Sequence, residues 1–315
     1  MLRYLLGRIA GLVATLVVAS FIVFGALYLV PGDPASNLLS GMKVTPELVA
    51  SVREQYHLND PFFVRYWDWV MGLLHGDFGQ SLHFRQDVAG LILSRLPTTM
   101  LLVLMAGLLI VIGGLAVGAF AAFRPGIVDR LTLSSTAIVA AIPMFVSALV
   151  LIYAFSSGLG WFPAFGNGSG FWDRVYHLIL PAIALAIAYM ALVARVTRSS
   201  MRAELRSEHV FVARGRGITG ERLFFRHVLR NALPPVFTLA GVVVAGLLVS
   251  SQIVEVAFGL SGIGSLLVQS VQTDDFPVVQ AITMIVVFAF VITNLVIDLL
   301  LPLVDPRMRR KEVTR

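Results

Sequence analysis

Few residues in this 315-residue sequence combine the type and spacing that catalysis needs. A phosphate-binding loop needs a Gly-Lys pair before Ser or Thr, and neither Lys43 nor Lys311 follows a glycine. Ser261, in the sequence GLSG, would need a histidine base in a neighbouring helix to act as a nucleophile, yet no histidine follows His227. The sequence therefore predicts that the chain is not an enzyme.

Metal and thiol chemistry are also unsupported. The six histidines, at positions 57, 75, 83, 177, 209 and 227, lack the spacing of a metal site. Because the chain has no cysteine, it can form no disulfide, thiol nucleophile or thiolate metal site. We expect neither a metal nor a cofactor in this chain.

The composition requires a membrane around the chain. Hydrophobic residues make up 57% of the sequence and charged residues 13%, which is about half the charged fraction of a soluble domain. Crossing about 30 Å of hydrocarbon takes around 20 apolar residues of helix, and lipid offers no partner for an open strand edge. The sequence predicts an all-α polytopic membrane protein with six spans, at 9–30, 96–123, 131–156, 175–194, 234–254 and 276–301.

Arginine placement predicts the orientation, because positive residues near helix ends resist translocation. The segment 195–233 holds nine arginines against three glutamates, and both tails and the loop after the second span are also positive. We expect both termini and this segment to be cytoplasmic. The charges flank apolar spans instead of forming a face with base-stacking aromatics, so membrane lipid is the expected partner and nucleic acid is not.

Residues 31–95 are expected to form an extracytoplasmic loop with interfacial helices. Thr45-Pro46-Glu47 has the residues of a helix start. After Asp60-Pro61, aromatic and aliphatic residues accompany Arg65 and Asp68 in a pattern typical of a helix at the membrane interface. This stretch is interpreted as an aromatic belt that anchors the loop, as a docking surface for an external partner, or as both.

The cytoplasmic segment is too long for a simple turn between two membrane helices. Apolar residues recur among its arginines, and glycines at 215, 217 and 220 divide it. We expect one short helix before Gly217 and a second before Pro234, with Pro234-Pro235 opening the fifth span.

Transport driven by an ion gradient is the alternative from another class. Such a carrier keeps ionisable groups inside its spans, and only His177, Glu255 and Asp298 come near such a position, each at a predicted helix end. A chain with six spans, no energy source and a large cytoplasmic segment favours a permease driven by a separate ATPase.

The residues from Glu208 to Val236 support that hypothesis. They closely resemble the ATPase-coupling loop of binding-protein-dependent ABC importer permeases of the dipeptide/oligopeptide class, which have an acid, an alanine five residues on, a glycine nine residues on and then RHxLRNAL-x-P. Further motifs of this class follow in order along the chain: PGDP at 31–34, HGDFGQSL at 75–82, WFPAFG at 161–166, FGLSGIG at 258–264 and DPRMR at 305–309. One departure is Phe211-Val212-Ala213, where the general importer motif has Glu-Ala-Ala.

The resemblance implies a type I ABC importer permease fold in a bacterial or archaeal cytoplasmic membrane. It implies a second homologous permease, two ATPase subunits that bind ATP and Mg, and an extracytoplasmic substrate-binding protein. Di- or oligopeptides are the expected substrates, with nickel chelates or glutathione as alternatives. The implied ATPase-coupling interface comprises Glu208, Phe211, Ala213, Arg214, Arg216 and Gly217, in which Ala213 and Gly217 would allow close approach, Phe211 would be buried and the two arginines would pair with acids.

Overall fold

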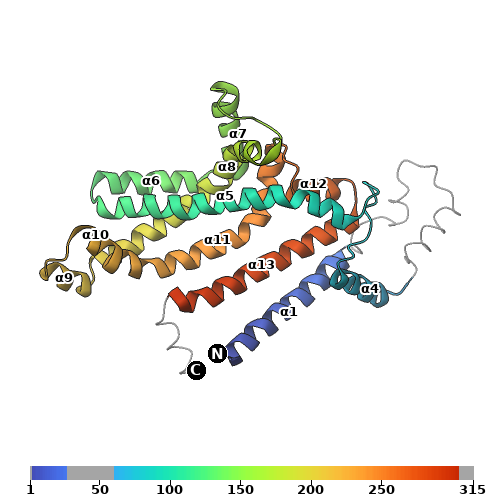
Figure 1. The fold of residues 1–315 in the computed structure, drawn as a ribbon, viewed down its shortest axis with the longest axis horizontal. Coiled ribbons are helices and arrows are strands. Elements are labelled where there is room, and N and C mark those ends of the chain that lie inside the picture. Colours follow the sequence, from blue (N-terminus) through green and yellow to red (C-terminus); the bar gives the residue numbers. More distant parts are fainter. Residues whose placement is uncertain (1, 27–59, 305–315) are drawn as a thin grey trace. The chain divides into compact units, whose positions relative to one another are not determined.

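The computed structural model describes residues 2–26 and 60–304, and this part of the chain is almost entirely helical (Figure 1). An isolated bridge between Gln80 and Asp87 is the only strand pairing among the described residues. Contacts divide the chain into two compact units, Met1–Pro97 with Ser265–Val291 and Thr98–Gly264 with Ile292–Arg315. Each unit is considered by itself below.

The first unit contains α1 (Leu2–Ala26), α4 (Phe62–His75), most of α12 (Ile263–Gln272) and the first half of α13 (Phe276–Val304). An aromatic cluster joins α4 to α1: the Phe24 ring lies 5.3 Å from those of Phe62 and Trp69, centroid to centroid. The hydroxyls of Ser20 and Tyr66 share a 2.8 Å hydrogen bond. The helix predicted after Asp60-Pro61 is therefore present, whereas the one predicted at Thr45 lies outside the described residues.

A buried carboxylate organises the loop that follows α4. Asp275, between α12 and α13, is fully buried and accepts hydrogen bonds from the Ser81 hydroxyl at 2.5 Å and from the backbone N–H groups of Leu82 and His83. Ser81 in turn accepts from the N–H of Phe84. These bonds replace the water that the carboxylate loses on burial, and they fix the turn at residues 81–84.

Glycines of α5 (Val88–Phe123) determine its packing in the second unit. A Cβ added at Gly114 would lie 2.6 Å from the Val193 side chain, and one at Gly118 would lie 2.4 Å from the carbonyl oxygen of Ala194. Both contacts are to α8 (Gly170–Leu205), so the Gly114-x-x-x-Gly118 pair brings two helices of this chain together. The core continues onto α7 (Met144–Leu151) and α11 (Arg230–Ala257).

Within residues 2–26 and 60–304, five helices are long and apolar enough to cross a membrane, or up to six if the two helices of a bent pair form one span. The five stretches are Leu6–Ala26, Val88–Phe123, Gly170–Leu205, Gly220–Ala257 and Phe276–Ile297. Several exceed the predicted spans: α8 has 36 residues, or about 54 Å of helix, and extends well into the segment that was predicted to begin at residue 195.

The predicted third span, 131–156, is not one straight helix. It divides into α6 (Ile127–Ala141) and α7, which a π-helical stretch, Ile152–Gly158, continues, and the two parts are bent by 101°. Pro143 explains the break, because proline lacks the N–H of the helical ladder and forces the preceding residue into extended geometry. Ile142 adopts that geometry, with φ −75° and ψ 124°.

The fifth span does not open at Pro234-Pro235 as predicted. Both prolines lie inside α11, which is preceded directly by α10 (Gly220–Leu223) and a π-helical stretch, Phe224–Leu229. Helices tolerate proline where local π geometry supplies other partners for the freed carbonyls. The helix therefore extends back from the predicted start into the arginine-rich segment.

Candidate functional site

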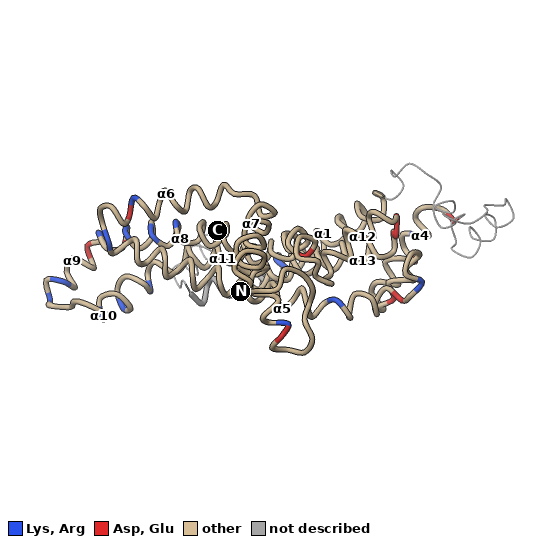
Figure 2. Tube along the Cα trace, turned by 90° about the horizontal axis from the view of Figure 1, so that it is seen from above, with Lys and Arg blue, Asp and Glu red and all other residues tan. Residues whose placement is uncertain are grey.

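The arginine-rich segment consists of the C-terminal end of α8, the short helix α9 (Glu208–Gly215) and the stretch that leads through α10 into α11. The helix α9 follows α8, and a turn connects it to α10. Figure 2 shows most of the arginine positions described in the second unit gathered at one end, on α9, α10 and the adjoining ends of α6 and α8, whereas Arg174 lies near the start of α8. The charges and α9 therefore share one end of this unit.

Gly217 ends α9 through a left-handed turn. Its φ is +78°, its N–H donates to the carbonyl of Arg214 at 2.9 Å, and the N–H of Ile218 donates to that of Ala213 at 3.0 Å. These two bonds form a Schellman motif, in which glycine is favoured because a side chain is strained at positive φ. A Cβ at Gly217 would meet nothing within 4 Å, so in this chain its backbone conformation, and not close approach, requires glycine.

One face of α9 is locked into the chain. Val210 is fully buried and Ala213 is 4% exposed, and both belong to an apolar cluster with Met201 of α8 and Val228 and Ala232 of the following helices. We expected Ala213 to allow close approach of a partner. The structure instead uses its small side chain for packing inside this chain.

The opposite face of α9 is open. Phe211 is 79% exposed, and Glu208, Arg214, Arg216 and Gly217 are exposed as well. The structure thus brings five of the six predicted interface residues to the surface of one short helix and its turn. A large exposed aromatic ring among charges is the composition of an interface centre, in which aromatic residues and arginine are enriched.

His209 is a residue that motif reasoning missed. Its Nε2 lies 3.1 Å from the Asn231 amide nitrogen and 3.3 Å from a Glu204 carboxylate oxygen, while Asn231 also donates to the carbonyl of His227 at 3.0 Å. These contacts connect α9 to the end of α8 and to the start of α11. Asn231 and His227 both belong to the RHxLRNAL motif. This motif was the feature of the sequence from which a contact with α9 could have been predicted.

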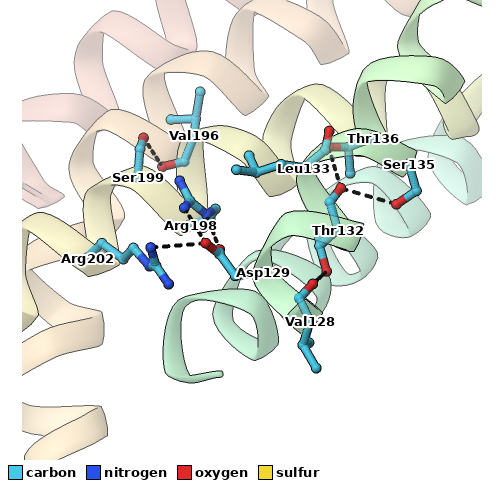
Figure 3. Close-up of polar contacts among 10 residues, drawn as sticks. All are labelled: Val128, Asp129, Thr132, Leu133, Ser135, Thr136, Val196, Arg198, Ser199 and Arg202. Atoms are coloured by element: carbon cyan, nitrogen blue, oxygen red, sulfur yellow. Dashed lines mark hydrogen bonds and ion pairs between the residues drawn. The ribbon is translucent and has the colours of Figure 1, made fainter. Parts of the chain in front are cut away.

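An ion cluster braces the same end of the second unit (Figure 3). Asp129 of α6 receives two hydrogen bonds from Arg198 of α8, at 2.5 and 2.7 Å, and pairs with Arg202 at 3.0 Å. The Asp129 side chain is nearly buried, so this bidentate geometry satisfies a carboxylate that has lost most of its contact with water. Arg198 and Arg202 therefore fix α6 against α8.

Of the three ionisable residues near the predicted span ends, Glu255 and His177 form internal contacts, and the side chain of Asp298 lies outside the part of the chain that the structure describes. Glu255 is fully buried and accepts a hydrogen bond from Thr99 at 2.7 Å, while Gly262 leaves room for its carboxylate. His177 pairs with Asp173 one turn away on α8, at 3.3 Å. Among the residues described, no group of His, Cys, Asp and Glu is arranged to hold a metal ion.

Family comparisons match nearly the whole chain. Residues 114–310 match the family described as "Binding-protein-dependent transport system inner membrane component". Residues 1–103 match the family described as "Binding-prot-dependent transport system membrane comp, N-term". The matches therefore cover both the segment that contains α9 and the part that contains α1 and α4.

Similar proteins match over their full length. The glutathione transport system permease protein GsiC of Salmonella typhimurium strain LT2 is 36% identical over 312 residues, which are 99% of this chain and 100% of that protein. GsiC of Escherichia coli strain K12 gives the same figures. GsiC of Salmonella choleraesuis is 37% identical over 314 residues, again 99% of this chain and 100% of that protein.

Two solved transporters share the fold. An amino acid ABC transporter crystallised with histidines has a TM-score of 0.52 at 24% identity, covering 69% of this chain and 94% of that one. The MetNI methionine ABC transporter, in inward-facing conformations, has a TM-score of 0.53 at 17% identity, covering 68% and 96%. Together with the family matches, these findings confirm the predicted family resemblance and the all-helical polytopic fold. The chain belongs to the family of binding-protein-dependent transport system inner membrane components, as a multi-pass, non-catalytic subunit of the cytoplasmic membrane.

Proposed function

We propose that this chain forms half of a membrane pathway for short peptides. A second permease of the same family would supply the other half, an extracytoplasmic binding protein would deliver the substrate, and two ATPases would supply the energy. The peptide class is supported by the full-length relatives, which are named for glutathione, because glutathione is itself a tripeptide. Dipeptides, longer peptides and glutathione all belong to this class, and nickel chelates are the alternative.

The two faces of α9 are the observation that carries the energy-coupling part of the proposal. Val210 and Ala213 pack the inner side of α9 against the rest of the chain. A force applied to the outer side of α9 would therefore be transmitted to the helices on which it packs. Phe211 provides apolar area on the outer side, and Arg214 and Arg216 provide charge for acids on an ATPase. A rigid element with one fixed and one open face is suited to seat in a socket.

Movement of α9 would reach two membrane helices at once. The chain connects α9 to α8 through Arg206 and Ser207, and the Ser207 hydroxyl donates to the Glu204 carbonyl at 2.6 Å. On the other side, His209 contacts Asn231 at the start of α11. When ATP closes the ATPases, displacement of α9 would therefore shift the ends of α8 and α11 together, a rigid-body change of the kind that alternates access.

The proposed orientation of the chain in the membrane rests on the arginine-rich end of the second unit. Most of the arginines described in this unit lie together with α9, and positive loops remain in the cytoplasm. We infer that this end is cytoplasmic, as are both termini. The ATPases would then meet α9 from the cytoplasm while the binding protein docks on the opposite side.

The substitution Phe211→Ala tests the coupling proposal. Burying a phenylalanine side chain contributes about 2 kcal/mol, so its loss predicts an ATPase affinity that is weaker by roughly thirtyfold. The assay is titration of the purified ATPase onto permease complexes in nanodiscs. Phe171→Ala is the matched control, because Phe171 is 62% exposed but lies outside the arginine-rich segment. Equal ATPase affinities for the two variants would overturn the assignment of α9.

The transport proposal is tested separately with the reconstituted complex and its binding protein. ATP-dependent uptake of labelled dipeptides, oligopeptides and glutathione is expected, with one peptide class preferred. Uptake of only a nickel chelate would reject the peptide assignment while leaving the coupling assignment intact. Uptake by the permeases alone, driven by an ion gradient, would reject both.

A further inference from the structure

The helix α4 has a second apolar face that no described part of the chain covers. Phe63, Trp67, Met71 and Leu74 are 71%, 61%, 38% and 76% exposed. Their spacing of four, four and three residues places them in one stripe along the helix. Four large apolar side chains in a row form a contiguous surface, which soluble proteins rarely leave in water.

This stripe lies beside the face that packs on α1. The α1-facing residues Phe62, Tyr66 and Trp69 contact Phe21 and Phe24 with centroid distances of 5.3 to 5.6 Å. At 100° per residue, the stripe is centred about a third of a turn away from these residues. The apolar arc of α4 is therefore much wider than α1 can cover.

Polar residues occupy the remaining arc of α4. Asp68 and His75 are both exposed and lie about a quarter of a turn beyond the stripe. The helix thus presents three sectors in order: one against α1, one apolar and open, and one polar. A helix with a large apolar face and a separate polar face is typical of the membrane interface.

The contacts of α4 lie towards one end of a membrane-spanning helix. They involve residues 20–24 of α1, in the C-terminal half of the described apolar run Leu6–Ala26, which can span a membrane. The helix α4 therefore packs away from the middle of that run, as expected of a helix at the membrane interface.

The exposed surface of α1 is apolar as well. Val13, Val17, Val18 and Ile22 are all exposed large apolar residues on α1. Because α1 is a membrane-spanning helix, these side chains face lipid or another membrane helix. The stripe therefore belongs to a helix that packs directly on an apolar, membrane-spanning helix.

We propose that α4 lies in the bilayer interface at the C-terminal end of α1, with Phe63, Trp67, Met71 and Leu74 among the acyl chains. Asp68 and His75 point towards water. The occupant of the stripe is lipid, and not the extracytoplasmic binding protein. The helix thereby anchors the start of the loop that Asp275 organises at residues 81–84, and it holds that loop close to the membrane surface.

Spin labelling tests this placement directly, since the chain has no cysteine of its own. The substitution Trp67→Cys places a label on the stripe, and Asp68→Cys places one on the polar arc of the same turn. The full chain is examined in lipid nanodiscs with two relaxing agents, molecular oxygen, which concentrates in lipid, and a water-soluble nickel chelate. We expect the oxygen-to-nickel collision ratio at position 67 to exceed that at position 68 several-fold.

Two results would overturn the proposal. If the nickel chelate reaches position 67 as readily as position 68, the stripe faces water and is free for a protein partner. If neither agent reaches position 67, the stripe is covered by protein, either residues 27–59 of this chain or a second copy. Phe63→Cys and Leu74→Cys repeat the measurement on the same stripe, so a single variant that fails to fold does not decide the outcome.

Discussion

Replacing Gly217 by alanine isolates the left-handed turn that ends α9. The added methyl group would meet nothing within 4 Å, so its effect is confined to the backbone, whose φ is +78°. A left-handed conformation costs an L-residue about 1–2 kcal/mol. The two hydrogen bonds of the turn, to the carbonyls of Ala213 and Arg214, should open more often by about fivefold to thirtyfold.

Gly215→Ala is the matched control. Gly215 lies in α9, has no positive φ, and also has nothing within 4 Å of an added Cβ. Alanine there removes the helix penalty of glycine, which is up to about 1 kcal/mol, so the same turn should become more stable. Hydrogen–deuterium exchange of the Gly217 and Ile218 amides in the assembled complex measures both effects, which are expected to have opposite signs. Equal exchange in the two variants would refute the Schellman assignment.

The larger substitution Gly217→Trp separates strain from docking. Within this chain, tryptophan meets no more obstruction near Cβ than alanine does. If Gly217→Trp loses more substrate-stimulated ATP hydrolysis than Gly217→Ala does, the additional loss therefore reports a clash between residue 217 and another subunit. We expect Gly217→Trp to insert and assemble but to lose that stimulation, and normal stimulation would exclude Gly217 from the ATPase interface.

Two further predictions concern the packing of the second unit. Asp129→Asn leaves Arg198 without its carboxylate and should lower the free energy of unfolding by about 3 kcal/mol, read as a lower thermal midpoint in nanodiscs; an unchanged midpoint would contradict a buried ion pair. Gly118→Val places side-chain atoms against the Ala194 carbonyl and should destabilise by about 1–3 kcal/mol, whereas Gly246→Val, with nothing within 4 Å, should cost little. Similar midpoints for the two valine variants would show that α5 and α8 are not in close contact.

Much of the fold could be predicted because its signals are local. Uncharged runs indicate membrane helices whatever surrounds them, since lipid requires an apolar surface and internal hydrogen bonds. The short helix before Gly217 was also predictable, because glycine is the usual residue just beyond a helix end. Boundaries were less accurate, since arginine-rich turns such as those of α8 beyond residue 195 remain helical without being apolar.

Proline shows where local signals fail. Pro143 breaks the third predicted span, whereas Pro181 lies inside the 36-residue helix α8 and Pro234 inside α11. The same residue type ends one helix and is accommodated inside others. The outcome depends on whether neighbouring turns and helices can satisfy the freed carbonyls. The local sequence pattern around a proline does not contain this information.

The sequence by itself determined the class of the protein and the position of its candidate coupling helix, because hydropathy, charge and the glycine at 217 act locally. Only the tertiary structure decided which side of α9 is open. Val210 and Phe211 are both apolar, so composition could not separate them. Packing against Met201 and Val228 buries the first and leaves the second exposed, since the helix can present only one face to the rest of the chain.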